Sequence, residues 1–431
     1  MFHLGIFSSI APYTWRSPYA GRARTEWTDP RYYAEVAESL ERGGFDAIVF
    51  EDSSQVVDTY QGTMEYGLRT GTAAPKLDPV CYAGVIARRT RHIGIIPTVA
   101  TTFYPPFLLA RLMATLDHLT GGRVGANLVT GSTHLAAQNY GLDRQVEHER
   151  YAMADEWAEL VRALWGSWEP DAIVADSARR MFADPAKVHA VDFQGRWYRS
   201  AGPLNTAPSP QGRPVLCQAG GSPAGRDFAA KHADIVVSAV LGVEAMKAYR
   251  EDMSARMRAV GRDPSELKVL YLVQPVLGET EAQAKDRKAR KEAMSDAVLE
   301  DNLFWMSYYS GVDFGAFDLD APMPDVAARV NGHRSTMADY ATAGAGRTLR
   351  ELASTHNVSE SVELVGTPDS VAAQMEEVMA EAGGDGFLLT GDLSRRRIAE
   401  LTDGLSPALR RRGLIRDGYD SPYLRDNLLA F

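Results

Sequence analysis

Short apolar runs alternate with longer segments of helical periodicity along most of the chain. Runs of this length, bounded by polar or glycine-containing turns, are typical of buried strands. Strands that alternate with helices indicate βαβ units and a parallel sheet. Because there are eight such runs, we predict an α/β protein with a (β/α)₈ TIM barrel. The predicted strands lie within residues 3–9, 45–52, 92–102, 123–131, 214–220, 234–240, 267–278 and 385–392.

Helix boundaries are marked by capping residues. In the segment 29–44, Asp29 is placed to cap the helix, Pro30 fits its first turn, and two glycines end it. Asp78 and Pro79 open another helix with the same chemistry. Residues 106–122 form a further predicted helix, with four leucines on one side: Leu108, Leu112, Leu116 and Leu119.

Two segments interrupt the repeat. We predict a single TIM-barrel domain over residues 1–431 with insertions at about 167–213 and 279–365. The second insertion begins with a highly charged helix. Loops this long inside a compact domain are usually lids or binding loops. For the first insertion, a solvated decoration or a contact between subunits is an equally open interpretation.

Composition narrows the classes of partner. The formal charge of −10 argues against nucleic acid or an anionic membrane, because both require clustered Lys and Arg. Two cysteines cannot build a disulfide framework or a cysteine-based zinc site, and the nine histidines are scattered, so we expect no metal. The N-terminus lacks the pattern of a signal peptide, and no stretch is apolar for long enough to span a bilayer. We therefore expect a cytoplasmic protein.

Polar residues follow several predicted strands. Asp52, Thr98, Asn127 and Ser222 lie at or beyond strand ends, where TIM barrels carry their chemistry, although each of them has a purely local alternative as a cap or a strand residue. Motifs for dinucleotides, nucleoside triphosphates, zinc proteases and serine hydrolases are absent. The stretch CQAGGSPAGRDFAAKHAD leads from a strand through glycines into a helix, and a helix N-terminus favours a phosphate. A phosphorylated cofactor fits both features.

The chain resembles the bacterial luciferase-like flavin monooxygenases. The resemblance is greatest to the branch that acts on nitrilotriacetate, EDTA, dibenzothiophene sulfone and long-chain alkanes, and it covers nearly the whole length. The resemblance is carried by an ordered set of stretches, RGGFDAIVFED, APKLDPV, RHIGIIPTVATTFYPPFLLARLMATLDHLTGGRVGANLVTG, ERYAMADEW, QAGGSPAGRDFAAKHAD, GVDFGAFDLDAPMPD and DGFLLTGD.

The resemblance implies a barrel that binds FMN noncovalently. It implies reduced flavin (FMNH₂) delivered by a separate NAD(P)H:flavin reductase, and O₂ as co-substrate. Oxygen would add to the flavin to give a C4a-peroxyflavin, which oxygenates a small molecule. We also expect a homo-oligomer, either a dimer or a tetramer.

The family's flavin-binding positions carry over to particular residues here. Asp52 and Thr98 match positions that line the flavin site, and Asn127 matches the family's Asn after the fourth strand, which contacts the flavin ring. Tyr151 and Ser222 match the phosphate end, with the Gly221 amide beside them, although Tyr151 also begins a helix with an apolar stripe and has packing as an alternative role. The family usually has a His four residues before this Tyr. Glu147 occupies that place in this chain, and we assign the role to His148 instead.

The sequence also offers candidates for proton transfer and for contacts with the substrate. His134 is a candidate for proton transfer, with His333 in reserve, because the ordinary pKa of His lies near neutrality; an exposed loop histidine is the alternative for His134. Aromatic residues predict an aromatic or heteroaromatic substrate: Tyr13, Trp15, Trp305, Tyr308 and Tyr309. Three arginines offer the alternative of a carboxylate substrate: Arg16, Arg22 and Arg24. A deazaflavin-dependent oxidoreductase and a non-catalytic flavin-binding protein are the alternative functions.

Overall fold

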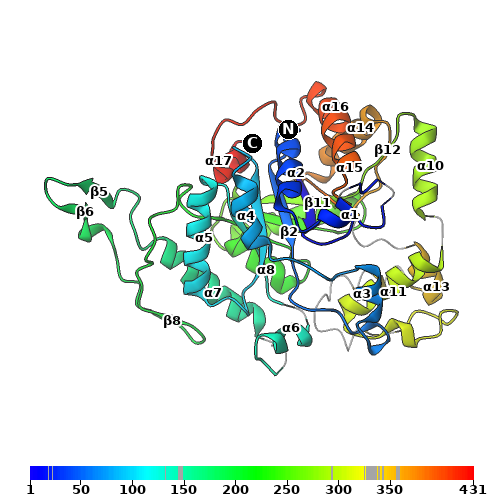
Figure 1. The fold of residues 1–431 in the computed structure, drawn as a ribbon, viewed down its shortest axis with the longest axis horizontal. Helices are drawn as coiled ribbons and strands as arrows, with labels where there is room; N and C mark the ends of the chain where they lie inside the picture. The colour runs from blue at the N-terminus through cyan, green and yellow to red at the C-terminus, as the bar shows by residue number, and fades with distance from the viewer. Residues whose placement is uncertain are drawn as a thin grey trace.

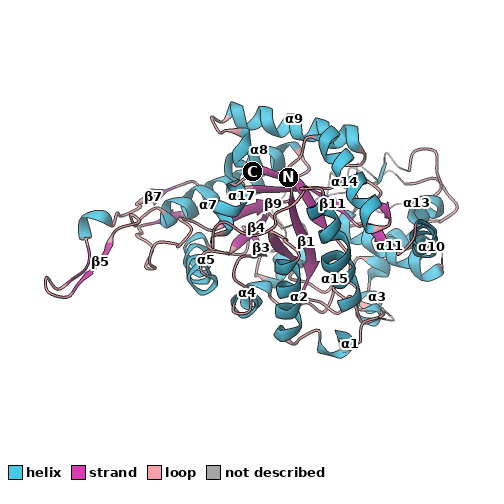
Figure 2. Cartoon of the chain, turned by 90° about the horizontal axis from the view of Figure 1, so that it is seen from above, coloured by secondary structure: helices cyan, strands magenta, loops and turns pink. Residues whose placement is uncertain are grey.

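Eight parallel strands form a closed barrel at the centre of the molecule (Figure 1 and Figure 2). The structure is a computed structural model that describes residues 1–17, 19–21, 23–131, 133–143, 149–292, 295–324, 326, 337, 340–341, 344–355 and 360–431. The barrel order is β1-β14-β11-β10-β9-β4-β3-β2, and β2 pairs with β1 to close it. The strands span His3–Ser9 (β1), Ala47–Glu51 (β2), Gly94–Ala100 (β3), Gly125–Val129 (β4), Val215–Gln218 (β9), Ile235–Ser238 (β10), Lys268–Val273 (β11) and Gly386–Leu389 (β14).

Each barrel strand falls within one of the eight runs predicted from the sequence, and the predicted α/β barrel is confirmed. The strand-to-strand pairing is parallel throughout, as βαβ units require. Inward-facing apolar side chains fill the barrel, and a second layer of apolar residues joins the strands to the helices outside. The barrel is therefore a packed core whose chemistry is confined to its ends.

Helices surround the barrel. The predicted caps of two of them are present, because Asp29 accepts a hydrogen bond from the Arg31 amide and Asp78 accepts one from the Val80 amide. The principal helices around the barrel are Pro30–Arg42 (α2), Pro79–Ala87 (α4), Pro106–Thr120 (α5), Arg150–Trp165 (α7), Pro223–His232 (α8), Val243–Ala259 (α9) and Pro368–Ala382 (α14).

The leucine side of α5 differs from the expectation. Leu108 and Leu119 are 52% and 62% exposed, and only Leu116 of the four predicted leucines is buried. The face that packs against the barrel is instead built around Leu109 and Met113. The helix is apolar on most of its circumference, so leucine spacing alone does not identify the inner face.

Shorter elements occupy the connections. They comprise Ala23–Glu26 (α1), Glu65–Thr70 (α3), His134–Asn139 (α6), Val276–Leu277 (β12), Val365–Gly366 (β13), Arg395–Ala399 (α15), Ser406–Arg411 (α16) and Leu424–Leu429 (α17), with 3₁₀ turns at Tyr60–Gly62, Pro185–Lys187, Pro264–Glu266 and Phe314–Ala316 and a π-helical turn at Glu400–Leu405. Among the described residues, no helix combines the length and the apolar character needed to cross a membrane.

The segment 279–365 contains the helices Glu281–Glu292 (α10), Asp296–Ser310 (α11) and Leu349–Thr355 (α13). Its α11 packs with the loop that follows β2 and forms a second apolar cluster separate from the barrel core. Polar contacts also tie α11 to the rest of the chain; for example, Asp301 accepts hydrogen bonds from the Tyr66 hydroxyl at 2.8 Å and from Arg16 at 3.2 Å. This insertion is therefore a folded cover with its own core.

The segment 167–213 has a different form. Two hairpins, Ile173–Asp176 (β5) with Met181–Ala183 (β6) and Phe193–Gln194 (β7) with Arg199–Ser200 (β8), extend from the side of the molecule (Figure 1 and Figure 2). Phe182 near the outer end is 69% exposed. This arm lies away from the carboxyl ends of the strands.

The opposite end of the barrel is closed by α17. Leu424 and Leu428 are buried against the inward-facing residues of the strands. Glycine at position 94 makes room for this contact, since a Cβ atom there would lie 2.5 Å from a methyl group of Leu424. The closed end leaves the carboxyl ends of the strands as the accessible mouth of the barrel.

Candidate active site

One cavity of about 1780 Å³ opens at the carboxyl ends of the strands. Every barrel strand, or the loop directly after it, contributes to the wall. A drug-sized ligand takes a pocket of roughly 300–1,000 Å³, so this cavity has room for a cofactor and a second small molecule together. Six of the residues predicted to bind the flavin line it, which brings them together in one site: Asp52, Thr98, Asn127, Tyr151, Gly221 and Ser222.

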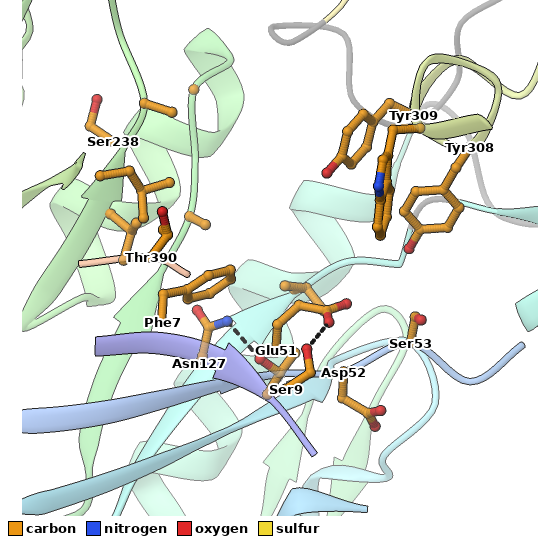
Figure 3. Close-up of a pocket in the computed structure, with 18 of the residues that line it drawn as sticks. Phe7, Ser9, Glu51, Asp52, Ser53, Asn127, Ser238, Tyr308, Tyr309 and Thr390 are labelled. Carbon is orange, nitrogen blue, oxygen red and sulfur yellow. Dashed lines mark hydrogen bonds between the residues drawn. The ribbon is translucent and has the colours of Figure 1, made fainter. Parts of the chain in front are cut away.

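Polar side chains at the floor have unused hydrogen-bonding atoms. Asn127 donates to the Thr98 hydroxyl at 2.8 Å, which orients its amide oxygen, Oδ1 (Figure 3). That oxygen, the Gln218 Oε1 and the Ser238 Oγ are buried, and within the described part of the chain none of them has a hydrogen-bond partner. Buried polar atoms without partners are rare and costly. These three come from β4, β9 and β10, which are neighbours in the barrel, and each lines the cavity with an atom that a ligand could use.

The carboxyl of Asp52 lies at another part of the wall. Burial raises its pKa to about 6, with the neighbouring Glu51 charge acting in the same direction and Lys76 opposing both. This carboxyl therefore changes its charge in the mildly acidic range. A buried acid with such a pKa in a cavity is a common feature of ligand sites.

The N-terminus of α8 forms a cradle at one edge of the cavity. Ser222 is its N-cap, and its hydroxyl oxygen accepts a hydrogen bond from the Gly225 amide at 3.2 Å. The absence of side chains is needed here, because a Cβ atom at Gly225 would lie 2.9 Å from the Tyr151 hydroxyl, and one at Gly220 would lie 2.2 Å from the Gln218 amide. The Ser222 hydroxyl hydrogen, the Tyr151 hydroxyl and the helix N-terminus together suit a phosphate.

Two arginines border the same cradle. Arg226 donates to the Gly221 carbonyl at 3.0 Å and to Asp252 at 2.9 Å, and Arg150 lines the cavity one residue before Tyr151. These cations favour an anion at this edge of the cavity. Neither arginine was predicted from the sequence. Their positions in the first turns of α7 and α8 are the signal that could have found them.

The predicted catalytic histidines are not part of the described cavity wall. His134 begins α6, is exposed, and is not among the lining residues. His148 and His333 lie outside the described residues, as does Glu147.

Aromatic residues of the cover form part of the wall. Trp305, Tyr308 and Tyr309 line the cavity, and the rings of Trp305 and Tyr309 stack with centroids 5.7 Å apart. Tyr13 lines it as well, whereas Trp15 lies outside, where its indole nitrogen donates to the Thr70 carbonyl.

The arginines that were considered for carboxylates are elsewhere. Arg16 pairs with Asp301, and Arg24 is exposed on α1. Arg22 lies outside the described residues. Neither of the two described arginines faces the cavity.

An ion pair at the end of β2 was missed by sequence reasoning. The Glu51 carboxylate lines the cavity and accepts from the Ser9 hydroxyl at 2.5 Å (Figure 3). It also accepts from Lys76 at 2.7 and 2.8 Å. The two partners are 25 positions apart, and no local motif links them. Only the fold brings Lys76 behind the strand end.

Comparison with known proteins assigns the family. The model of the luciferase-like monooxygenases matches residues 2–386. The chain is 36% identical over 414 residues to dibenzothiophene-sulfone monooxygenase of Rhodococcus erythropolis, covering 94% of this chain and 91% of that protein. It is 36% identical over 435 residues to dimethyl-sulfide monooxygenase of Hyphomicrobium sulfonivorans, covering 100% and 89% of the two chains.

A solved structure agrees with these relatives. Riboflavin lyase, determined with a modified FMN and its substrate riboflavin, superposes with a TM-score of 0.89 at 31% identity, over 100% of this chain and 96% of that one. The resemblance recognised in the sequence is confirmed. The chain belongs to the luciferase-like monooxygenase family and is an enzyme of that flavin-dependent class.

Proposed function

We propose that this enzyme binds FMN in the mouth of the barrel and oxygenates a small aromatic or heteroaromatic molecule. The phosphate would be held by Ser222, Tyr151 and the Gly221 amide. The flavin ring would lie against Asn127 and Thr98. The observation that carries the proposal is the combination, in one cavity, of three buried polar atoms without described partners and a glycine-lined cradle at a helix N-terminus.

When bound, reduced FMN with O₂ supplies the oxidising chemistry, and one oxygen atom enters the substrate while the other leaves as water. The protein's part is to bind, orient and exclude water. Asn127, fixed by Thr98, orients a ligand at the floor. The cover that carries Trp305 limits access of water to the cavity from above.

The source of electrons is a separate flavin reductase in this proposal. One relative is named as a component of a nitrilotriacetate monooxygenase, and another belongs by name to a pristinamycin IIA synthase built from more than one kind of chain. Both names support a system of more than one protein. We expect the purified chain with NADH and FMN to consume little oxygen, and we expect an added flavin reductase to restore uptake.

Oxygen electrode traces with and without the reductase test this. Rapid NADH oxidation by the purified chain alone would contradict the proposed division of labour. Turnover with a reduced deazaflavin and none with reduced FMN would contradict the choice of cofactor. Scoring products by mass spectrometry for the gain of one oxygen identifies the substrate.

A further inference from the structure

The ion pair of Glu51 and Lys76 is built into the wall of the cavity beside the aromatic cover. Glu51 is the last residue of β2, and Lys76 lies in the loop that leads to α4. The Lys76 ammonium group donates to both carboxylate oxygens of Glu51 and to the Ser53 hydroxyl at 2.9 Å. An ammonium group has three N–H donors, so these contacts use all of them.

The two charges are exposed to different degrees. The Lys76 side chain is 6% exposed and is not a lining residue, whereas the Glu51 side chain is 27% exposed and faces the cavity. The Lys76 ammonium group therefore lies on the side of the Glu51 carboxylate that faces away from the cavity. A ligand in the cavity meets an acceptor that Lys76 and Ser9 hold in one orientation.

Stability does not account for such a pair. Removing two charges from water is costly, and well-packed apolar residues in place of a buried ion pair are often as stable or more so. The position of this partly buried ion pair at a cavity wall points to a role in recognition.

Aromatic rings flank this acceptor. Tyr308 and Tyr309 come from α11 and lie on the same side of the cavity as Glu51, with the Tyr308 hydroxyl in hydrogen-bonding contact with Ser53 (Figure 3). Burial raises the pKa of Tyr308 to about 12, so its hydroxyl is neutral at physiological pH. With the stacked Trp305 ring, these side chains form an aromatic wall facing a fixed carboxylate. Flat aromatic ligands bury their faces well on such walls.

We propose that Glu51, positioned by Lys76, is a specificity-determining residue that accepts a hydrogen bond from an O–H or N–H group of an uncharged, planar aromatic substrate. The same wall disfavours anionic substrates. Glu51 and Asp52 both present carboxyl groups to the cavity, and the Lys76 charge is already engaged. This inference rests on the proposed function for the idea that the second ligand of the cavity is a substrate, and it names that substrate's class.

The test uses two isosteric bicyclic compounds, indole and benzofuran, which differ by one N–H donor, together with indole-2-carboxylate as the anion. Binding is measured by titration calorimetry on the FMN-loaded protein and again without FMN. We expect the parent to bind indole at least about tenfold more tightly than benzofuran, as for a hydrogen bond to a charged acceptor. Indole-2-carboxylate should bind most weakly.

The informative variant replaces both charges, Glu51→Met with Lys76→Met, so that no unpaired charge is buried. We expect it to keep its FMN affinity and to bind indole and benzofuran within about threefold of each other. The matched control is Glu65→Met, at an exposed residue of α3, which should keep the parental preference. Equal binding of the two probes by the parent, or a preference that survives in the double variant, would overturn the proposal.

The two hypotheses fail in different ways. An indole preference that depends on Glu51 but persists without any FMN affinity would support this recognition site and count against the proposed flavin function. Normal FMN-dependent oxygen uptake without an indole preference would leave the proposed function standing and reject the role of Glu51.

Discussion

Single residues at the cradle combine structural and ligand-binding roles. The Ser222 oxygen caps α8 by accepting from the Gly225 amide, and its hydrogen stays directed by that bond toward other acceptors. Tyr151 packs near Phe228 and brings its hydroxyl to the same place. Each residue therefore serves packing or capping as well as the proposed phosphate site, and a substitution that removes only the hydroxyl separates these roles.

Replacing Tyr151 with Phe or Ser222 with Ala should weaken FMN binding by about 1.5–3 kcal/mol each, because each removes a hydrogen bond to a charged acceptor. Fluorescence titration of the flavin measures the loss. Riboflavin, which has no phosphate, is the matched control ligand, and we expect its affinity to change little in either variant. Equal losses of affinity for riboflavin and FMN would mean that these two hydroxyls do not contact the phosphate.

At the scale of elements, α11 carries the aromatic wall on a base of its own. Its inner side packs into the second apolar cluster, and Asp301 ties it to α3 through Tyr66. This base is separate from the barrel core. Substitutions in the aromatic wall should therefore affect the oxygen chemistry at the bound flavin more than the stability of the barrel.

Replacing Trp305 with Ala should leave FMN affinity nearly intact and divert oxygen into hydrogen peroxide, at least about doubling the peroxide formed per oxygen consumed, because water gains access to the site. Peroxide yield is measured beside product yield and particle mass. Trp197→Ala on the projecting arm is the control. A changed mass with unchanged peroxide yield would mean that this insertion joins protomers and does not shield the site.

On the scale of the whole molecule, the two ends of the barrel have different tasks. The mouth carries the cavity and its polar residues, while α17 seals the other end with apolar side chains. A TIM barrel usually divides chemistry and stability between its ends in this way. Stability and ligand affinity should therefore respond to separate substitutions.

Replacing Leu424 with Ala should destabilise the protein by about 2–5 kcal/mol, because it opens a cavity beneath the strands. The FMN affinity of the folded protein should not change. Thermal unfolding and flavin titration give the two quantities. Leu429→Ala on the same helix, where the side chain is 47% exposed, is the control and should have little effect on either. Weakened FMN binding in Leu424→Ala would show that the two ends are coupled.

Local signals in the sequence determined the barrel and those residues of its ligand site that follow the strand ends. Eight apolar runs, the caps at Asp29 and Asp78, and the glycine turn before α8 act between neighbouring residues, so they can be read in order along the chain. Residues at strand ends, such as Asp52 and Asn127, were predictable for the same reason, because all carboxyl ends of a parallel barrel meet at one mouth.

Tertiary structure alone decided which distant residues meet. Lys76 pairs with Glu51, Tyr308 meets them from a helix more than 200 positions later, and Gln218 and Ser238 line the same cavity as Asn127. It also decided which side of α5 is buried, since apolar residues such as Leu108 and Leu119 lie on the exposed side as well. Contacts between residues far apart in the chain depend on how the elements pack, and packing leaves no periodic trace in the sequence.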